Sequence, residues 1–95
     1  MRIDELIWDD WNIKHIARHD VSEQEVEQVC EPGQHLARRA TKTDYGLTRY
    51  RVYGQSYSGR YLFIVLDRVR NHKFYVVTAR DMTEREKQAF KRQRK

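Results

Sequence analysis

The side chains of this sequence that are best suited to chemistry are a pair of histidines and a large set of arginines. His15 and His19 lie four residues apart, and imidazoles can donate or accept a proton near neutral pH. Arginine presents a planar fork of N–H groups that matches the oxygens of a phosphate. Such groups could cleave RNA, with His moving protons at the 2′-hydroxyl and the leaving 5′-oxygen and Arg stabilising the charge on the phosphate.

The candidate residues form two groups along the chain. The first group combines an indole, two imidazoles and a guanidinium group, namely Trp11, His15, Arg18 and His19. The second group contains four arginines, namely Arg49, Arg51, Arg60 and Arg80. Aromatic rings can stack on unpaired bases, while arginines hold the backbone. We therefore expect an RNA site if folding gathers the arginines into one pocket.

Members of the first group also have structural interpretations. Trp11 could belong to the core, His15 could be a solvated helix residue, and His19 could neutralise the negative end of a helix dipole. Cys30 falls on an apolar stripe, so we expect it in the core and not as a nucleophile.

The arginines of the second group could equally form structural ion pairs. Arg49 and Arg51 could lie on an exposed sheet face paired with glutamates. Arg80 follows an apolar run at a strand end, where a salt bridge to Asp81 or Glu84 competes with a functional role.

Composition narrows the class of protein. The 95 residues carry a net charge of +5, and arginine supplies most of the 19 basic residues, which favours a polyanionic partner. A single cysteine cannot form an internal disulfide, and no apolar run could cross a bilayer, so we expect a cytoplasmic protein without a membrane partner. Motifs for metal ions and nucleotides are missing, since His15 and His19 have no third ligand nearby, and we expect neither metal nor cofactor.

Two helices are predicted near the N-terminus, after a strand at Ile3–Trp8. Asp9 and Asp10 offer caps for a helix over Trp11–His19. Ser22 and Glu25 form a capping box for the second helix, which Pro32 and Gly33 end.

The remainder of the chain is rich in predicted strands. Residues 34–46 are hard to place, with a short strand possible at 35–40. Alternation predicts a strand at 47–53, the apolar run 61–66 predicts a central strand, and 74–79 predicts the next strand, with a turn at 54–59 and a charged loop at 67–73. Thr83 and Glu86 cap a last helix that ends near Arg92. This order predicts one α+β domain over 1–95, with a small antiparallel sheet of three to five strands, two N-terminal helices and one C-terminal helix.

Most of the sequence resembles the BrnT family of type II toxins. The resemblance begins with Ile7-Trp8-Asp9, Asn12 and the segment Ala17-Arg18-His19-Asp20-Val21. It continues through Arg51-Val52-Tyr53-Gly54, Gly59-Arg60-Tyr61-Leu62-Phe63-Ile64-Val65 and Thr78-Ala79-Arg80, followed by Glu84, Glu86 and Phe90. These segments occur in the family's order.

The resemblance implies a RelE-like fold and a metal-independent ribonuclease that blocks translation. It also implies a cognate antitoxin through which the toxin oligomerises, and an RNA substrate that is in some cases ribosome-associated. Carried over by position, His19, Arg60 and Arg80 are the expected catalytic residues. The expected RNA-binding residues are Arg18, Arg49, Arg51, Trp11 and His15.

One departure from the family pattern affects a proposed role. The usual Lys-His-Gly reads Arg18-His19-Asp20 here. An arginine does not readily lose its proton, so Arg18 is expected to bind phosphate and not to act as a base.

Two other functions use the same basic surface. The chain could be a non-enzymatic nucleic-acid-binding or regulatory module, or a protein-interaction domain that meets an acidic partner. Intact RNA bound in a salt-sensitive way would indicate the first, and no nucleic-acid binding at low salt would indicate the second.

Overall fold

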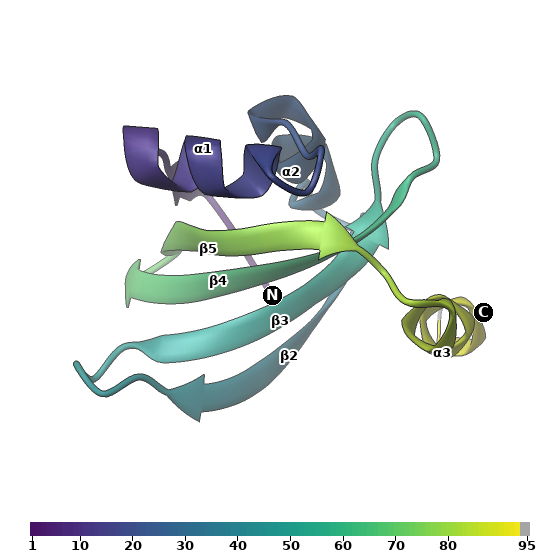
Figure 1. Ribbon diagram of the computed structural model, residues 1–95. Helices are drawn as coiled ribbons and strands as arrows, with labels where there is room; N and C mark the ends of the chain where they lie inside the picture. The colour runs from purple at the N-terminus through teal and green to yellow at the C-terminus, as the bar shows by residue number, and fades with distance from the viewer. Residues whose placement is uncertain (94–95) are drawn as a thin grey trace.

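A computed structural model describes residues 1–93, which form a five-stranded sheet and three helices (Figure 1). The strand order is β1-β5-β4-β3-β2, and all pairs are antiparallel except β1 with β5. In chain order the elements are β1 (Glu5–Ile7), α1 (Asp10–Ala17), α2 (Glu23–Val29), β2 (His35–Lys42), β3 (Thr48–Gln55), β4 (Tyr61–Arg70), β5 (Lys73–Asp81) and α3 (Glu84–Gln93). The α+β prediction is confirmed. None of the described helices is long and apolar enough to cross a membrane.

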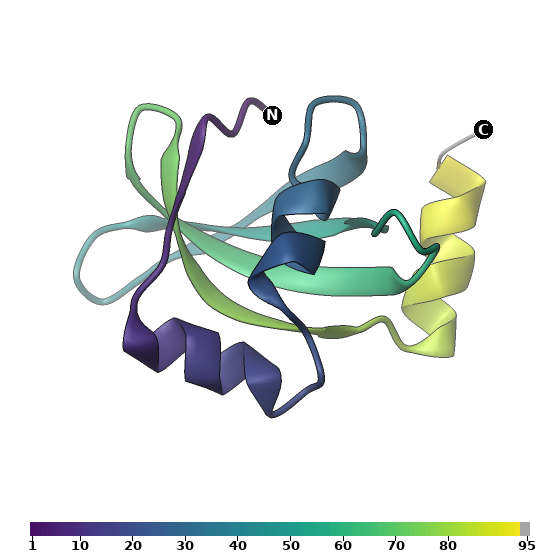
Figure 2. The ribbon, with the colours of Figure 1, turned by 90° about the horizontal axis from the view of Figure 1, so that it is seen from above.

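Helices α1 and α2 cover one face of the sheet (Figures 1 and 2). Both begin at reciprocal capping boxes, one formed by Asp9 with Asn12 and the other by Ser22 with Glu25. The core beneath them is built from apolar side chains of the helices and of alternate strand positions. They include Ile16, Val26, Val29, Val52, Leu62, Ile64, Leu66, Phe74, Val76 and Ala79.

Asn12 is a fully buried polar residue that the sequence patterns do not predict. Its side-chain amide donates to the carbonyl oxygens of Ile7 at 2.9 Å and Val76 at 3.1 Å. These two bonds fasten α1 to β1 and to β5. Because β1 pairs only with Lys73–Tyr75, α1 lies along the part of β5 that β1 leaves unpaired.

The charged loop predicted at 67–73 is wrong, because β4 continues to Arg70 and β5 begins at Lys73. Asp67 can remain within a strand because it lies opposite Arg49 on β3 and forms an ion pair with it. Asn71 occupies the tight turn between the two strands, with φ of 46°.

Gly54 lies inside β3, so the turn predicted from this glycine onward starts only after Gln55. A β-carbon at Gly54 would lie 2.7 Å from the Gln34 carbonyl oxygen and 2.8 Å from a methyl carbon of Val29. The glycine is therefore required by close packing of β3 against α2 and the start of β2.

Helix α3 lies on the side of the sheet away from α1 and α2, across one end of the strands (Figure 1). Its Phe90 meets the edge of the Tyr61 ring, with ring centroids 6.0 Å apart. The rest of this side, which we call the open face, carries the strand residues that alternate with the core, such as Arg51, Val65 and Thr78. Val65 is half-buried there, whereas its neighbours Ile64 and Leu66 are fully buried under the helices.

Candidate functional site

Three aromatic side chains form a continuous stack on the outer side of α1. The Trp11 indole is 60% exposed and stacks on the His15 imidazole, with centroids 4.9 Å apart and planes 7° from parallel. The edge of the His15 ring meets His19 at a centroid distance of 6.1 Å. The four-residue spacing places all three rings on one side of the helix. The structural interpretation of Trp11 as a core residue is therefore wrong.

His15 connects this helix to the sheet. Its Nε2 atom lies 3.1 Å from the hydroxyl oxygen of Thr78 on β5. Thr78 lies opposite Val65, which in turn lies opposite Arg51. Thr78, Val65 and Arg51 thus form a row across three strands on the open face. The His15 imidazole lies at the Thr78 end of this row, and the exposed Arg51 lies at the other end.

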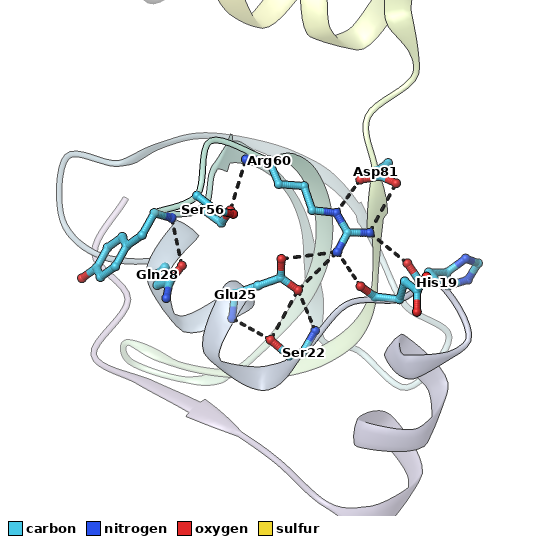
Figure 3. Close-up of polar contacts among 10 residues, drawn as sticks. His19, Ser22, Glu25, Gln28, Ser56, Arg60 and Asp81 are labelled. Carbon is cyan, nitrogen blue, oxygen red and sulfur yellow. Dashed lines mark hydrogen bonds and ion pairs between the residues drawn. The ribbon is translucent and has the colours of Figure 1, made fainter.

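Arg60 does not project into solvent but joins four segments of the chain (Figure 3). Its guanidinium group donates to the Asp81 carboxylate, at 2.7 Å from Nε, and to Glu25, at 3.2 Å from Nη1. It also donates to the backbone carbonyl oxygens of His19, at 3.1 Å, and of Asp20. The side chain is 25% exposed, and its hydrogen bond lowers the pKa of Asp81. Arg60 therefore holds the segment that follows α1 against α2 and the end of β5.

Asp20 has φ of 59°, which lies in the left-handed region. Glycine occupies that region without steric cost. Asp and Asn tolerate it better than other residues with a β-carbon, so an aspartate can occupy this position.

Arg80 is held by α3. It donates to both oxygens of Glu86, at 2.8 and 3.0 Å, and lies over the Phe63 ring at 4.1 Å. The hydrogen bond from Arg80 lowers the pKa of Glu86. Neither Asp81 nor Glu84 supplies the carboxylate that we expected, because Glu86 is turned back toward the sheet by its capping bond to the Thr83 amide, at 2.9 Å.

Arg49 belongs to a structural ion pair at the far end of the open face. It donates to the two oxygens of Asp67 at 2.7 and 2.9 Å, and that carboxylate is only 2% exposed. The Tyr45 hydroxyl donates to the same carboxylate at 3.0 Å. The pairing with glutamate that we considered is thus a pairing with a buried aspartate.

The eight candidate residues are therefore not gathered in one pocket. The structure brings together Trp11, His15 and His19, and it attaches Arg60 to the His19 backbone. Among residues 1–93, Arg18 and Arg51 have no carboxylate within salt-bridge distance, whereas the other three arginines do.

Sequence reasoning missed two residues of this surface. Lys14 lines a small hollow with Trp11, His15 and Arg18. Thr78 was overlooked as well, although a signal for it existed, because it precedes Arg80 by two residues in a strand and so lies on the same side. In the described part of the chain, no three His, Cys, Asp or Glu side chains are grouped as metal ligands would be.

Comparison with known proteins adds one match. The family model described as ribonuclease toxin, BrnT, of type II toxin-antitoxin system matches residues 8–86, which include all eight candidate residues. No curated protein matches the chain.

Proposed function

The chain belongs to the BrnT family of ribonuclease toxins of type II toxin-antitoxin systems, and we propose that it cleaves RNA where α1 meets the open face of the sheet. The observation that carries the proposal is the contact between His15 and Thr78, at 3.1 Å. Through this contact, the stacked rings of α1 form one surface with the row that contains Arg51.

The proposed chemistry divides among these side chains according to their contacts. His19 is exposed, and we assign it one proton transfer in cleavage at the 2′-hydroxyl. His15, held between Trp11 and Thr78, is its counterpart at the leaving oxygen. Trp11 stacks on a base, while Arg18 and Arg51 neutralise the phosphate charge. This scheme uses no metal ion.

Arg60 and Arg80, which we expected to be catalytic, have other roles in this proposal. Arg60 is anchored by Asp81 and Glu25 and donates to the backbone carbonyl oxygens of His19 and Asp20, so we regard it as a positioning residue for His19. Arg80 is on the open face, two residues beyond Thr78, and could bind phosphate by exchanging one of its two bonds to Glu86. Arg49 is assigned to stability, because its fork is fully engaged by Asp67.

Membership of a type II system implies a protein antitoxin. We propose further that the fold is RelE-like, that cleavage inhibits translation in the bacterial cytoplasm, and that the toxin oligomerises through its antitoxin. Ribosome-bound mRNA is one substrate to test beside free RNA.

The experiment compares cleavage of a 5′-end-labelled single-stranded RNA by the wild type and by His15→Ala and His19→Ala. We expect each substitution to reduce the rate by about 10²–10⁴-fold, the usual contribution of a general acid or base. His72→Ala is the matched control, because His72 lies exposed in the turn between β4 and β5. The reaction is repeated with EDTA, which should leave the rate unchanged. Equal activity of His19→Ala and His72→Ala would contradict the proposal.

A second function is favoured by the ion pairs of Arg49, Arg60 and Arg80. Because these guanidinium groups already hold carboxylates, fewer are free to stabilise a transition state than a nuclease based on arginine would need. The alternative is a module that binds RNA without cutting it. Intact end-labelled RNA in a salt-sensitive complex would support that alternative.

A further inference from the structure

Two arginines on the helix-covered side of the sheet approach the same tyrosine hydroxyl. Tyr50 lies directly opposite Arg39 on β2. It also lies opposite Leu66 on β4, and Arg68 is two residues beyond Leu66, so it is on the same side of the sheet. Both guanidinium groups are near enough to the Tyr50 phenol to lower its pKa.

The tyrosine is a rigid base for this arrangement. Tyr50 is only 9% exposed, and its ring packs edge-to-face with Phe74, with centroids 5.8 Å apart. The hydroxyl is thus fixed by the core, whereas the two arginines are exposed. A fixed hydroxyl between two exposed guanidinium groups can hydrogen-bond an anion that binds both.

The charges of this cluster are not balanced by carboxylates. Within residues 1–93, no Asp or Glu lies within salt-bridge distance of Arg39 or Arg68. The nearest carboxylate in sequence, Asp67, is bound to Arg49 on the opposite side of the sheet. Two adjacent cations without a counter-ion repel each other, and a bound anion would remove that cost.

Titration of the phenol agrees with this geometry. Burial raises the pKa of Tyr50, but the hydrogen bonds and charges of Arg39 and Arg68 together outweigh burial, and the net pKa lies below the ordinary value of 10.0. The tyrosine therefore reports directly on whether the two cations are neutralised.

We propose that Arg39, Arg68 and the hydroxyl of Tyr50 form a second phosphate-binding site, which holds a backbone phosphate of RNA. Its assignment to RNA rests on the proposed function, but the site itself is separate from the α1 surface. Strand β2 is an edge of the sheet, and Arg38 and Arg39 project from it to opposite faces. An RNA strand that passes around this edge would reach the second site from the open face.

The test measures RNA affinity as a function of salt in the His19→Ala background, where the RNA stays intact. For single strands, each lost phosphate contact reduces the slope of log K against log salt by about 0.7, so Arg39→Gln/Arg68→Gln should reduce it by about 1.4. Arg2→Gln/Arg85→Gln removes the same charge at exposed positions elsewhere and should change the slope by much less. Equal changes in the two double variants would overturn the proposal.

A second readout follows the Tyr50 phenol by NMR with ¹³C-labelled tyrosine. Saturating RNA should raise the pKa of Tyr50, and this rise should vanish in Arg39→Gln/Arg68→Gln. A response to inorganic phosphate but not to RNA would overturn the assignment to RNA. Failure of the proposed function would look different, because RNA would bind with these signatures and the wild type would not cut it.

Discussion

The Nη2 atom of Arg60 lies 3.1 Å from the backbone carbonyl oxygen of His19. This hydrogen bond joins the residue that immediately precedes β4 to the segment that follows α1. The bond satisfies a carbonyl at a helix end, where no further turn of helix supplies a donor. It also fixes the backbone of the histidine to which we assign proton transfer. In the proposed mechanism, the position of His19 thus depends on a side chain that need not touch RNA.

Replacing Arg60 should therefore affect stability and activity together. Arg60→Ala removes hydrogen bonds to two carboxylates and two carbonyl oxygens, and we expect the free energy of unfolding to fall by about 2–3 kcal/mol. Arg60→Lys should retain part of both properties. Urea denaturation and RNA cleavage at a temperature where each variant is folded provide the measurements, with Arg85→Ala as control. A fully stable Arg60→Ala that cannot cleave would instead indicate direct catalysis.

Thr78 should influence the rate of cleavage more than the fold. Thr78→Val keeps the shape of the side chain but removes the hydroxyl that His15 contacts, at a cost of about 1 kcal/mol for one hydrogen bond, or about fivefold in rate. Thr78→Ser should restore the wild-type profile. Rates measured from pH 5 to 9 test this, and identical profiles for all three proteins would show that the contact has no role.

Stability should decline in acid because of two carboxylates. The hydrogen bond from Arg80 holds the pKa of Glu86 below its ordinary value of 4.5, and the bond from Arg60 lowers the pKa of Asp81 from 3.8. A lowered pKa in the folded state gives stabilisation that is present above the ordinary value and is lost as the pH falls through the folded value. We expect the free energy of unfolding to fall below about pH 4.5.

Urea unfolding between pH 3 and 7 measures this acid dependence. Glu86→Gln should be less stable at pH 7 and should lose less stability on acidification. The same acid loss in Glu86→Gln and in the wild type would contradict the assignment to Glu86.

Asp20 should accept glycine but not a β-branched residue. At φ of 59°, Asp20→Gly removes backbone strain, and we expect an unchanged or higher melting temperature. Asp20→Val should cost about 1–3 kcal/mol, because a β-branched side chain is poorly tolerated in this region. Thermal unfolding measures the melting temperatures of the two variants and of the wild type. A melting temperature for Asp20→Val equal to that of the wild type would rule out strain at this position.

Local sequence signals predicted the elements of the fold well. Ser22 and Glu25 form the capping box that their spacing indicated, and the apolar run after Tyr61 lies at the centre of the sheet. These signals depend on residues close together in the sequence. The extension of β4 could not be predicted in this way, because Asp67 is stabilised by Arg49, whose position on the neighbouring strand becomes known only with the fold.

The candidate site was predicted less completely, for the same reason. The exposed stack of Trp11, His15 and His19 follows from helical spacing and was visible in the sequence. The partners of the arginines were not, since Arg60, which precedes β4, pairs with Glu25 on α2 and with Asp81 on β5. An arginine that binds phosphate and one that binds a carboxylate have the same local sequence pattern.

The parallel pairing of β1 with β5 has a consequence for biosynthesis. Glu5 faces Lys73, and the Asn12 amide donates to the carbonyl oxygen of Val76, so β1 and α1 wait for partners that are translated later, on β5. Until β5 has left the exit tunnel, the histidines of α1 have no Thr78 to join. The contact of His15 with Thr78 therefore forms only after the chain has been synthesised through β5.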